Sequence, residues 1–336
     1  MTGAEPIACL LDTLDALEFI ARHLHPPRLQ ELLAALGDRD AALRDAVWPE
    51  ALREPLQRAA TATLRACDGL RAAEDVRQVY RALRQIPRAL EALFPLAGQL
   101  PASDRLFGTP GAGEVLHFHN ETDQRGGFSV YLPGKRDPAH PSPLVMALHG
   151  GSGHGRLFLW SWLREVRGRG VVLVAPTATG DTWSLMEPQV DSAHLARVLD
   201  QVAQRWPLDR THLLLTGMSD GGTFTLLSGL EEESPFTHLA PVAASFHPLL
   251  LTMAEPRRLT GLPVYLVHGA LDWMFPVSMA RTAYRALSAA GANVVYREIA
   301  DLSHVYPRQE GSAILDWMLR PGAKVDASEA ARSPPC

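Results

Sequence analysis

The chain has 336 residues, 46% of them hydrophobic and 21% charged, a composition typical of globular proteins that excludes disorder as its main state. A formal net charge of −5 argues against a nucleic-acid-binding protein held by bulk positive charge, and no apolar run is long enough to predict a transmembrane helix. Cys9, Cys67 and Cys336 are too few and too far apart to predict disulfides or a paired-cysteine site. Because no secretory signal pattern is visible either, we expect a cytoplasmic protein.

The first hundred residues have the composition and apolar spacing of a helical domain. They are rich in Ala, Leu and Arg and hold only four of the 26 glycines, which weaken helices. Apolar residues recur there at steps of three and four, as in Leu10, Leu14 and Leu17. We therefore predict four to six short amphipathic helices in a domain spanning 1–100, followed by a Gly- and Pro-rich linker over 101–114.

Short Val- and Leu-rich runs alternate with helical stretches after the linker, which predicts βαβ units and a mostly parallel sheet of about eight strands flanked by helices. No helix separates the first two runs, so they should pair antiparallel. This α/β catalytic domain is expected over 115–320, with a flexible tail over 321–336. The eight predicted strands cover residues 115–119, 128–133, 143–150, 171–176, 212–217, 239–246, 263–269 and 294–299.

A G-x-S-x-G pattern follows the fifth of these strands and precedes a helical stretch. It reads Gly217-Met218-Ser219-Asp220-Gly221. A serine on a tight strand-to-helix turn is exposed for attack, and glycines two residues before and after it let neighbouring backbone approach closely. The pattern and its context predict that Ser219 is a nucleophile.

A nucleophilic serine needs a base and an orienting carboxylate, which in this arrangement follow it in the order acid, then histidine. Asp272 comes just after the seventh predicted strand and His304 follows the eighth, so both lie at strand ends where such sites form. We predict that they are the catalytic acid and base. The alternative bases are His149, His247 and His268, and the alternative acid is Asp301.

Acyl transfer also needs backbone N–H groups that meet the developing oxyanion. One should be the amide of Asp220, directly after the nucleophile, and the second should come from the glycine-rich turn after the third predicted strand. We predict the amide of Gly151, with Ser152 as the alternative. The turn does not fit the glycine patterns of nucleotide-binding loops.

Together these segments resemble the α/β-hydrolase superfamily over roughly residues 115–320. The resemblance rests on GMSDGG around Ser219, the LHGGSG turn, HGALDWMFP with Asp272 and SHVYP with His304. The stretch leading into the serine looks most like the polyhydroxybutyrate-depolymerase and feruloyl-esterase branch. The resemblance implies ester hydrolysis with no metal and no organic cofactor. One departure is Asp220, where that branch usually has asparagine.

Two tryptophans are further candidates for the substrate pocket, because such pockets are mostly apolar. Trp183 follows the fourth predicted strand and Trp273 follows the predicted acid, and ordinary packing is the alternative for both.

We therefore expect a serine esterase acting on a small or polymeric ester, without nucleic acid or a membrane span as partner. Two alternatives stay open. One is a peptidase of the prolyl-oligopeptidase type, and the other is a hydrolase-like domain with mainly an interaction role, in which the N-terminal helices could also form a homo-oligomer.

Overall fold

The computed structural model describes residues 4–101, 103–108, 111–134, 137–252 and 254–320. The tail predicted over 321–336 lies outside this part of the chain.

The N-terminal hundred residues are helical, as predicted, because their apolar stripes pack against one another. Leu10, Leu14 and Leu17 of the first helix are fully buried. Asp75 caps the fifth helix by accepting a hydrogen bond of 2.8 Å from the amide of Gln78. The α-helices are α1 (Ala4–His23), α2 (Leu29–Leu36), α3 (Ala41–Arg44), α4 (Arg53–Arg71), α5 (Val76–Leu83) and α6 (Ile86–Leu93), with 3₁₀ turns at Pro26–Arg28, Glu50–Leu52 and Phe94–Leu96.

The remainder of the described chain builds one eight-stranded sheet in the order β1-β2-β4-β3-β5-β6-β7-β8. β1 pairs antiparallel with β2, and β2 with β4, whereas the other pairs are parallel. All eight predicted strands and the antiparallel first pair are confirmed. The strands are β1 (Gly113–Phe118), β2 (Phe128–Pro133), β3 (Ser142–Leu148), β4 (Val172–Pro176), β5 (Leu208–Met218), β6 (His238–Val242), β7 (Pro263–Gly269) and β8 (Asn293–Ile299).

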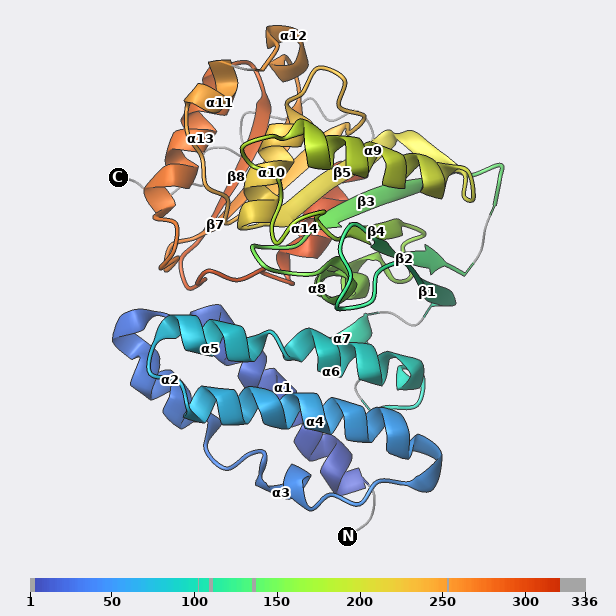
Figure 1. The fold of residues 1–336 in the computed structure, drawn as a ribbon, viewed down its shortest axis with the longest axis vertical. Helices are drawn as coiled ribbons and strands as arrows, with labels where there is room; N and C mark the ends of the chain where they lie inside the picture. The colour runs from blue at the N-terminus through green and yellow to red at the C-terminus, as the bar shows by residue number, and fades with distance from the viewer. Residues whose placement is uncertain (1–3, 102, 109–110, 135–136, 253, 321–336) are drawn as a thin grey trace.

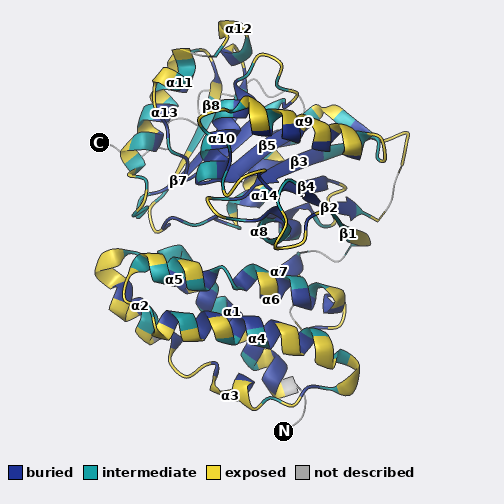
Figure 2. Cartoon of the chain, viewed as in Figure 1, coloured by how far each residue is buried: buried dark blue, intermediate teal, exposed yellow. Residues whose placement is uncertain are grey.

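Helices cover both faces of the sheet, each over its own apolar core. On one face lie α8 (Gly155–Val166) and α14 (Glu310–Met318). On the other lie α9 (Gln189–Ala203), α10 (Asp220–Gly229) and α13 (Val277–Ala289). Two short helices, α11 (Leu249–Thr252) and α12 (Pro256–Leu259), follow β6. Alternate residues of the inner strands therefore face opposite cores, as expected for a sheet buried on both sides, and β2, β3, β4, β6 and β7 are mostly dark blue in Figure 2.

The helical segment lies as a further layer below the sheet, with α5, α6 and α7 (Ser103–Phe107) facing the α/β part (Figure 1). One buried apolar cluster runs without interruption from this segment through α8 and α14 to the sheet. Glu91 of α6 accepts a hydrogen bond of 2.7 Å from Arg156 of α8 across this boundary. Helix α7 lies inside the segment predicted as a linker, and β1 begins two residues before position 115. The division of the chain into domains stays a prediction.

Within the described residues, no helix combines the length and apolar character needed to cross a membrane.

Candidate active site

Ser219 occupies a sharp turn between β5 and α10. Its φ of 57° and ψ of −121° place it in a backbone region that side-chain-bearing residues rarely adopt. Gly221 permits this turn, since a Cβ there would lie 2.5 Å from the carbonyl oxygens of both Leu148 and His149. The turn presents the serine at the carboxyl end of the sheet, as the sequence pattern predicts, although the side chain is almost fully buried.

The structure brings the three predicted catalytic residues together. His304 Nε2 lies 3.0 Å from Ser219 Oγ, and His304 Nδ1 lies 2.8 Å from Asp272 Oδ2. The second oxygen of Asp272 accepts hydrogen bonds from the amides of Met274 and Phe275, at 2.9 and 2.7 Å. The acid and base come from the loops after β7 and β8, and both side chains are buried. An imidazole held this way has one nitrogen free to take the serine proton.

The alternative bases and acid are engaged elsewhere. His149 accepts from the amide of Ala178 and donates to the carbonyl of Gly150, and burial lowers its pKa to about 3. His268 donates to the carbonyl of Phe275 at 2.9 Å, its Nε2 also lies 3.4 Å from Oδ2 of Asp272, and burial lowers its pKa too. Burial thus favours the neutral form of both histidines, and among the described residues no hydrogen bond joins either of them to Ser219.

The other two alternatives lie at the surface. His247 is exposed, with Nδ1 accepting from the amide of Leu249. Asp301 pairs with Arg22 at 2.9 Å and not with His304. The geometry therefore favours Asp272 and His304 over every alternative raised from the sequence.

The glycine-rich turn after β3 lies directly beside Ser219. A Cβ on Gly150 would be 3.5 Å from the Cβ of Ser219, and one on Gly151 would be 2.7 Å from Oδ2 of Asp220. Within the part of the chain described, the amides of Gly151 and Asp220 donate no hydrogen bond. Both are thus available to an oxyanion, and their assignment to the oxyanion hole stays a prediction.

The two candidate pocket tryptophans lie in different places. Trp183 is buried, donates to the carbonyl of His149 at 2.7 Å and stacks on Phe224, so it supports the glycine-rich turn from beneath. Trp273 lies beside the triad, and its ring centroid is 5.9 Å from that of His304. The substrate-pocket role of Trp273 stays a prediction.

Tyr80 reaches this site from α5, which sequence reasoning did not foresee. The centroid of its ring lies 6.0 Å from the ring centroid of His304 and 6.1 Å from that of Trp273. Burial raises the pKa of its hydroxyl, so Tyr80 is a neutral hydrogen-bonding group. In the sequence Tyr80 belongs to an ordinary apolar helix stripe, and no local pattern distinguishes it from a core residue.

A second unforeseen contact joins α1 to the loop that carries His304. The amide of Ser303 donates to the carbonyl of Arg22 at 2.8 Å, and the Ser303 hydroxyl donates to the carbonyl of Leu24. Ser303 directly precedes His304 in the chain, so the helical segment helps to hold the predicted base.

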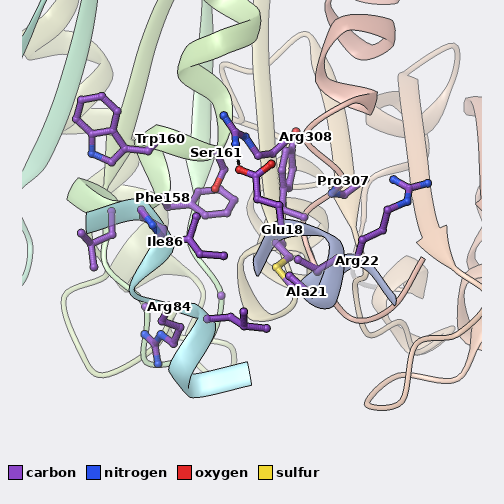
Figure 3. Close-up of a pocket in the computed structure, with 18 of the residues that line it drawn as sticks. Glu18, Ala21, Arg22, Arg84, Ile86, Phe158, Trp160, Ser161, Pro307 and Arg308 are labelled. Carbon is purple, nitrogen blue, oxygen red and sulfur yellow. Dashed lines mark hydrogen bonds and ion pairs between the residues drawn. The ribbon is translucent and has the colours of Figure 1, made fainter. Parts of the chain in front are cut away.

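A cavity of about 440 Å³ lies next to the triad, between the helical segment and α8. Figure 3 shows its lining, with Ile86 and Phe158 at its apolar part and Glu18 meeting Arg308 at its charged end. Among the described residues, no group of His, Cys, Asp and Glu side chains is arranged to hold a metal ion.

Comparison with known proteins agrees with this architecture. Residues 191–318 match the family model described as phospholipase/carboxylesterase. FphF of Staphylococcus aureus, a fluorophosphonate-binding serine hydrolase, superposes with a TM-score of 0.50 at 17% identity, covering 63% of this chain and 100% of FphF. The Pyrococcus horikoshii acylaminoacyl peptidase gives 0.51 at 12% identity, covering 67% of this chain and 44% of the peptidase. The search of curated proteins returned no match.

The protein thus has the α/β-hydrolase fold that was predicted. The family match supports a serine hydrolase, and its model is that of phospholipases and carboxylesterases rather than of the depolymerase and feruloyl-esterase branch.

Proposed function

We propose that this protein hydrolyses carboxylic esters through an acyl-enzyme on Ser219. The observation that carries the proposal is the continuous chain of hydrogen bonds from Ser219 Oγ through His304 to Asp272, at 3.0 and 2.8 Å. The phospholipase/carboxylesterase match over residues 191–318 supports esters as the substrate class.

The reaction follows from this geometry. Ser219 Oγ attacks the ester carbonyl carbon while His304 Nε2 takes the hydroxyl proton, and Asp272 stabilises the imidazolium through Nδ1. The amides of Gly151 and Asp220 hold the oxyanion. His304 then protonates the leaving alcohol, and the C–O bond breaks to leave the acyl-enzyme. Water attacks the acyl carbon with His304 as base, which releases the carboxylic acid and restores Ser219.

The resemblance to polyhydroxybutyrate depolymerases and feruloyl esterases would make the substrate polymeric or aromatic, and it stays a prediction. The peptidase alternative uses the same residues on an amide. The fold likeness to the acylaminoacyl peptidase is the observation that keeps it, although this chain spans less than half of that protein.

Hydrolysis of p-nitrophenyl acetate and of an N-acyl p-nitroanilide by wild type and Ser219→Ala tests the proposal. We expect ester turnover that falls at least about a thousandfold in the variant, and slower or absent turnover of the anilide. Equal ester rates in the two proteins would refute the proposal, and an anilide hydrolysed faster than the ester would favour the peptidase.

A further inference from the structure

We propose that the 440 Å³ cavity is the acyl-binding pocket and that it selects esters of uncharged, medium-chain carboxylic acids. This inference rests on the proposed ester hydrolysis and adds the substrate class. It also gives the N-terminal helices a direct part in substrate recognition, since they build one wall of the cavity.

The cavity adjoins the predicted catalytic residues on three sides. Met218, which lines it, directly precedes Ser219, and Gly150 and Gly151 bring the glycine-rich turn to its wall. Leu302 and Val305 line it from the loop that carries His304. The chain neighbours of Ser219 and His304 therefore line this cavity, which makes it the candidate space for an acyl group on Ser219.

Two segments far apart in sequence supply the apolar walls. Leu83, Ile86 and Leu90 come from α5 and α6, whereas Leu157 and Phe158 come from α8 (Figure 3). The cavity is therefore complete only when the helical segment is docked on the α/β part.

Four of the five Asp, Glu and Arg side chains of the lining have an oppositely charged partner in the protein. Arg22 pairs with Asp301, Arg308 with Glu18, and Asp15 with Arg105. Arg84 donates to the carbonyl of Ser152. A charged acyl group would need to displace a charged partner or bind Arg84 beside the neutral carbonyl of Ser152, because burying a charge without a partner is costly. The lining therefore favours a neutral acyl chain over a charged one.

The volume of this pocket, which is partly open to solvent, indicates how much of that chain the pocket can cover. A water molecule takes about 30 Å³ of the liquid, and a methylene group is of similar size, so a cavity of 440 Å³ holds roughly a dozen such groups. We expect an optimum between hexanoate and dodecanoate.

The test measures kcat/KM on p-nitrophenyl esters from acetate to palmitate for wild type, Leu83→Trp and Leu157→Trp. Each substitution puts a larger side chain into the cavity from one of its two walls. We expect both variants to shift the optimum towards shorter esters and to lower the decanoate-to-acetate ratio at least tenfold. The matched control is Arg81→Trp, because Arg81 is an exposed residue of α5 outside the cavity lining and should leave the profile unchanged.

Binding of methyl decanoate to Ser219→Ala, measured by calorimetry, separates this inference from the proposed reaction. In the Ser219→Ala protein, the smaller change Leu157→Phe should weaken the binding of methyl decanoate at least fivefold. This variant tests the pocket even if the tryptophan variants do not fold. Suppose that acetate hydrolysis depends on Ser219, that the rate does not vary with chain length, and that methyl decanoate does not bind. That result would refute the acyl-binding pocket but not the proposed ester hydrolysis. Binding that Leu157→Phe weakens, without hydrolysis of any ester, would uphold the pocket and overturn the reaction.

Discussion

At His304 the imidazole is held from two directions. Asp272 fixes Nδ1, and the adjoining Ser303 is tied to the carbonyls of Arg22 and Leu24 at the end of α1. A displacement of well under 1 Å at Nε2 would lengthen the bond to Ser219 and slow proton transfer. Ser303 is therefore a positioning residue, since it acts only through its neighbour.

Replacing Ser303 with alanine should lower kcat about tenfold while KM changes less than twofold, because the hydroxyl holds the base and does not touch substrate. Steady-state kinetics on a p-nitrophenyl ester check this, and Ser303→Thr should restore most of the rate. A purely structural role would instead lower the melting temperature and leave kcat of the folded fraction unchanged.

The carboxylate of Asp220 lies against the predicted oxyanion hole and accepts a hydrogen bond of 2.7 Å from the hydroxyl of Thr182. No ion pair to Asp220 occurs among the described residues. Because a negative charge there opposes the developing oxyanion, Asp220→Asn should raise kcat on a neutral ester about three- to tenfold.

The asparagine oxygen can still accept from Thr182, so the loop should keep its shape. The control is Asp181→Asn, which removes an exposed carboxylate from the same loop as Thr182. Unchanged or lower kcat in Asp220→Asn would contradict the electrostatic argument.

Among the elements, the turn between β5 and α10 is tightly constrained. It packs against the end of β3, where Gly221 leaves no room for a side chain. The backbone of Leu148 and His149 forms that wall, and backbone shifts at higher cost than the end of a flexible side chain.

Gly221→Ala should destabilise the protein by about 2 to 3 kcal/mol and lower esterase activity more than a hundredfold, since the added methyl displaces the turn that carries Ser219. Thermal unfolding and kinetics measure both effects. Gly98→Ala is the control, because nothing lies within 4 Å of a Cβ at that position. Similar behaviour of the two variants would show that the turn is more plastic than its geometry indicates.

The sequence predicts the strands and the triad because both depend on local rules. Ser219, Asp272 and His304 each follow an apolar strand, and the carboxyl ends of parallel strands meet at one edge. The roles of Tyr80 and Ser303 could not be predicted, because they arise where α5 and α1 dock on loops more than sixty residues away in the chain. Trp183 and Trp273 each follow a predicted strand, so the sequence does not distinguish them. Only the packing places Trp183 against the glycine-rich turn and Trp273 beside the triad.

At the scale of the whole molecule, the apolar core does not stop between the helical segment and the α/β part. The same buried cluster contains Leu10 of α1, Leu93 of α6, Trp162 of α8 and Ile314 of α14. Removing the helical segment would expose large apolar side chains of α8 to water, at roughly 25 cal/mol for each Å². We therefore expect the segment to fold together with the α/β part.

A fragment of residues 111–336 should therefore be insoluble or unfolded when expressed alone, because its α8 face would be exposed. Soluble yield and thermal melting by circular dichroism, with the full chain as control, check this. A soluble fragment with full esterase activity would contradict both the shared core and the shared acyl pocket.

Buried neutral histidines make stability depend on pH. Burial lowers the pKa of His149 to about 3 and that of His238 to about 4, against about 6.5 in an unfolded chain. Below pH 6.5 the unfolded state binds protons that the folded state does not. The free energy of unfolding is therefore highest above pH 6.5 and falls as the pH drops from there towards 4.

Urea denaturation at pH 7 and pH 5 should show this loss, and His238→Phe should reduce the difference between the two values by about 1 kcal/mol, after allowance for partial exposure. Phenylalanine keeps the edge contact with Trp317. An identical difference in wild type and variant would exclude His238 as a source of the pH dependence.

The central claim is that Ser219 is a nucleophile activated by His304, and covalent labelling with a fluorophosphonate tests it most directly. Peptide mass spectrometry of wild type should locate one phosphonyl adduct on Ser219, and His304→Ala should react at least a hundredfold more slowly. An adduct on another residue, no adduct, or an equal labelling rate in His304→Ala would contradict the account.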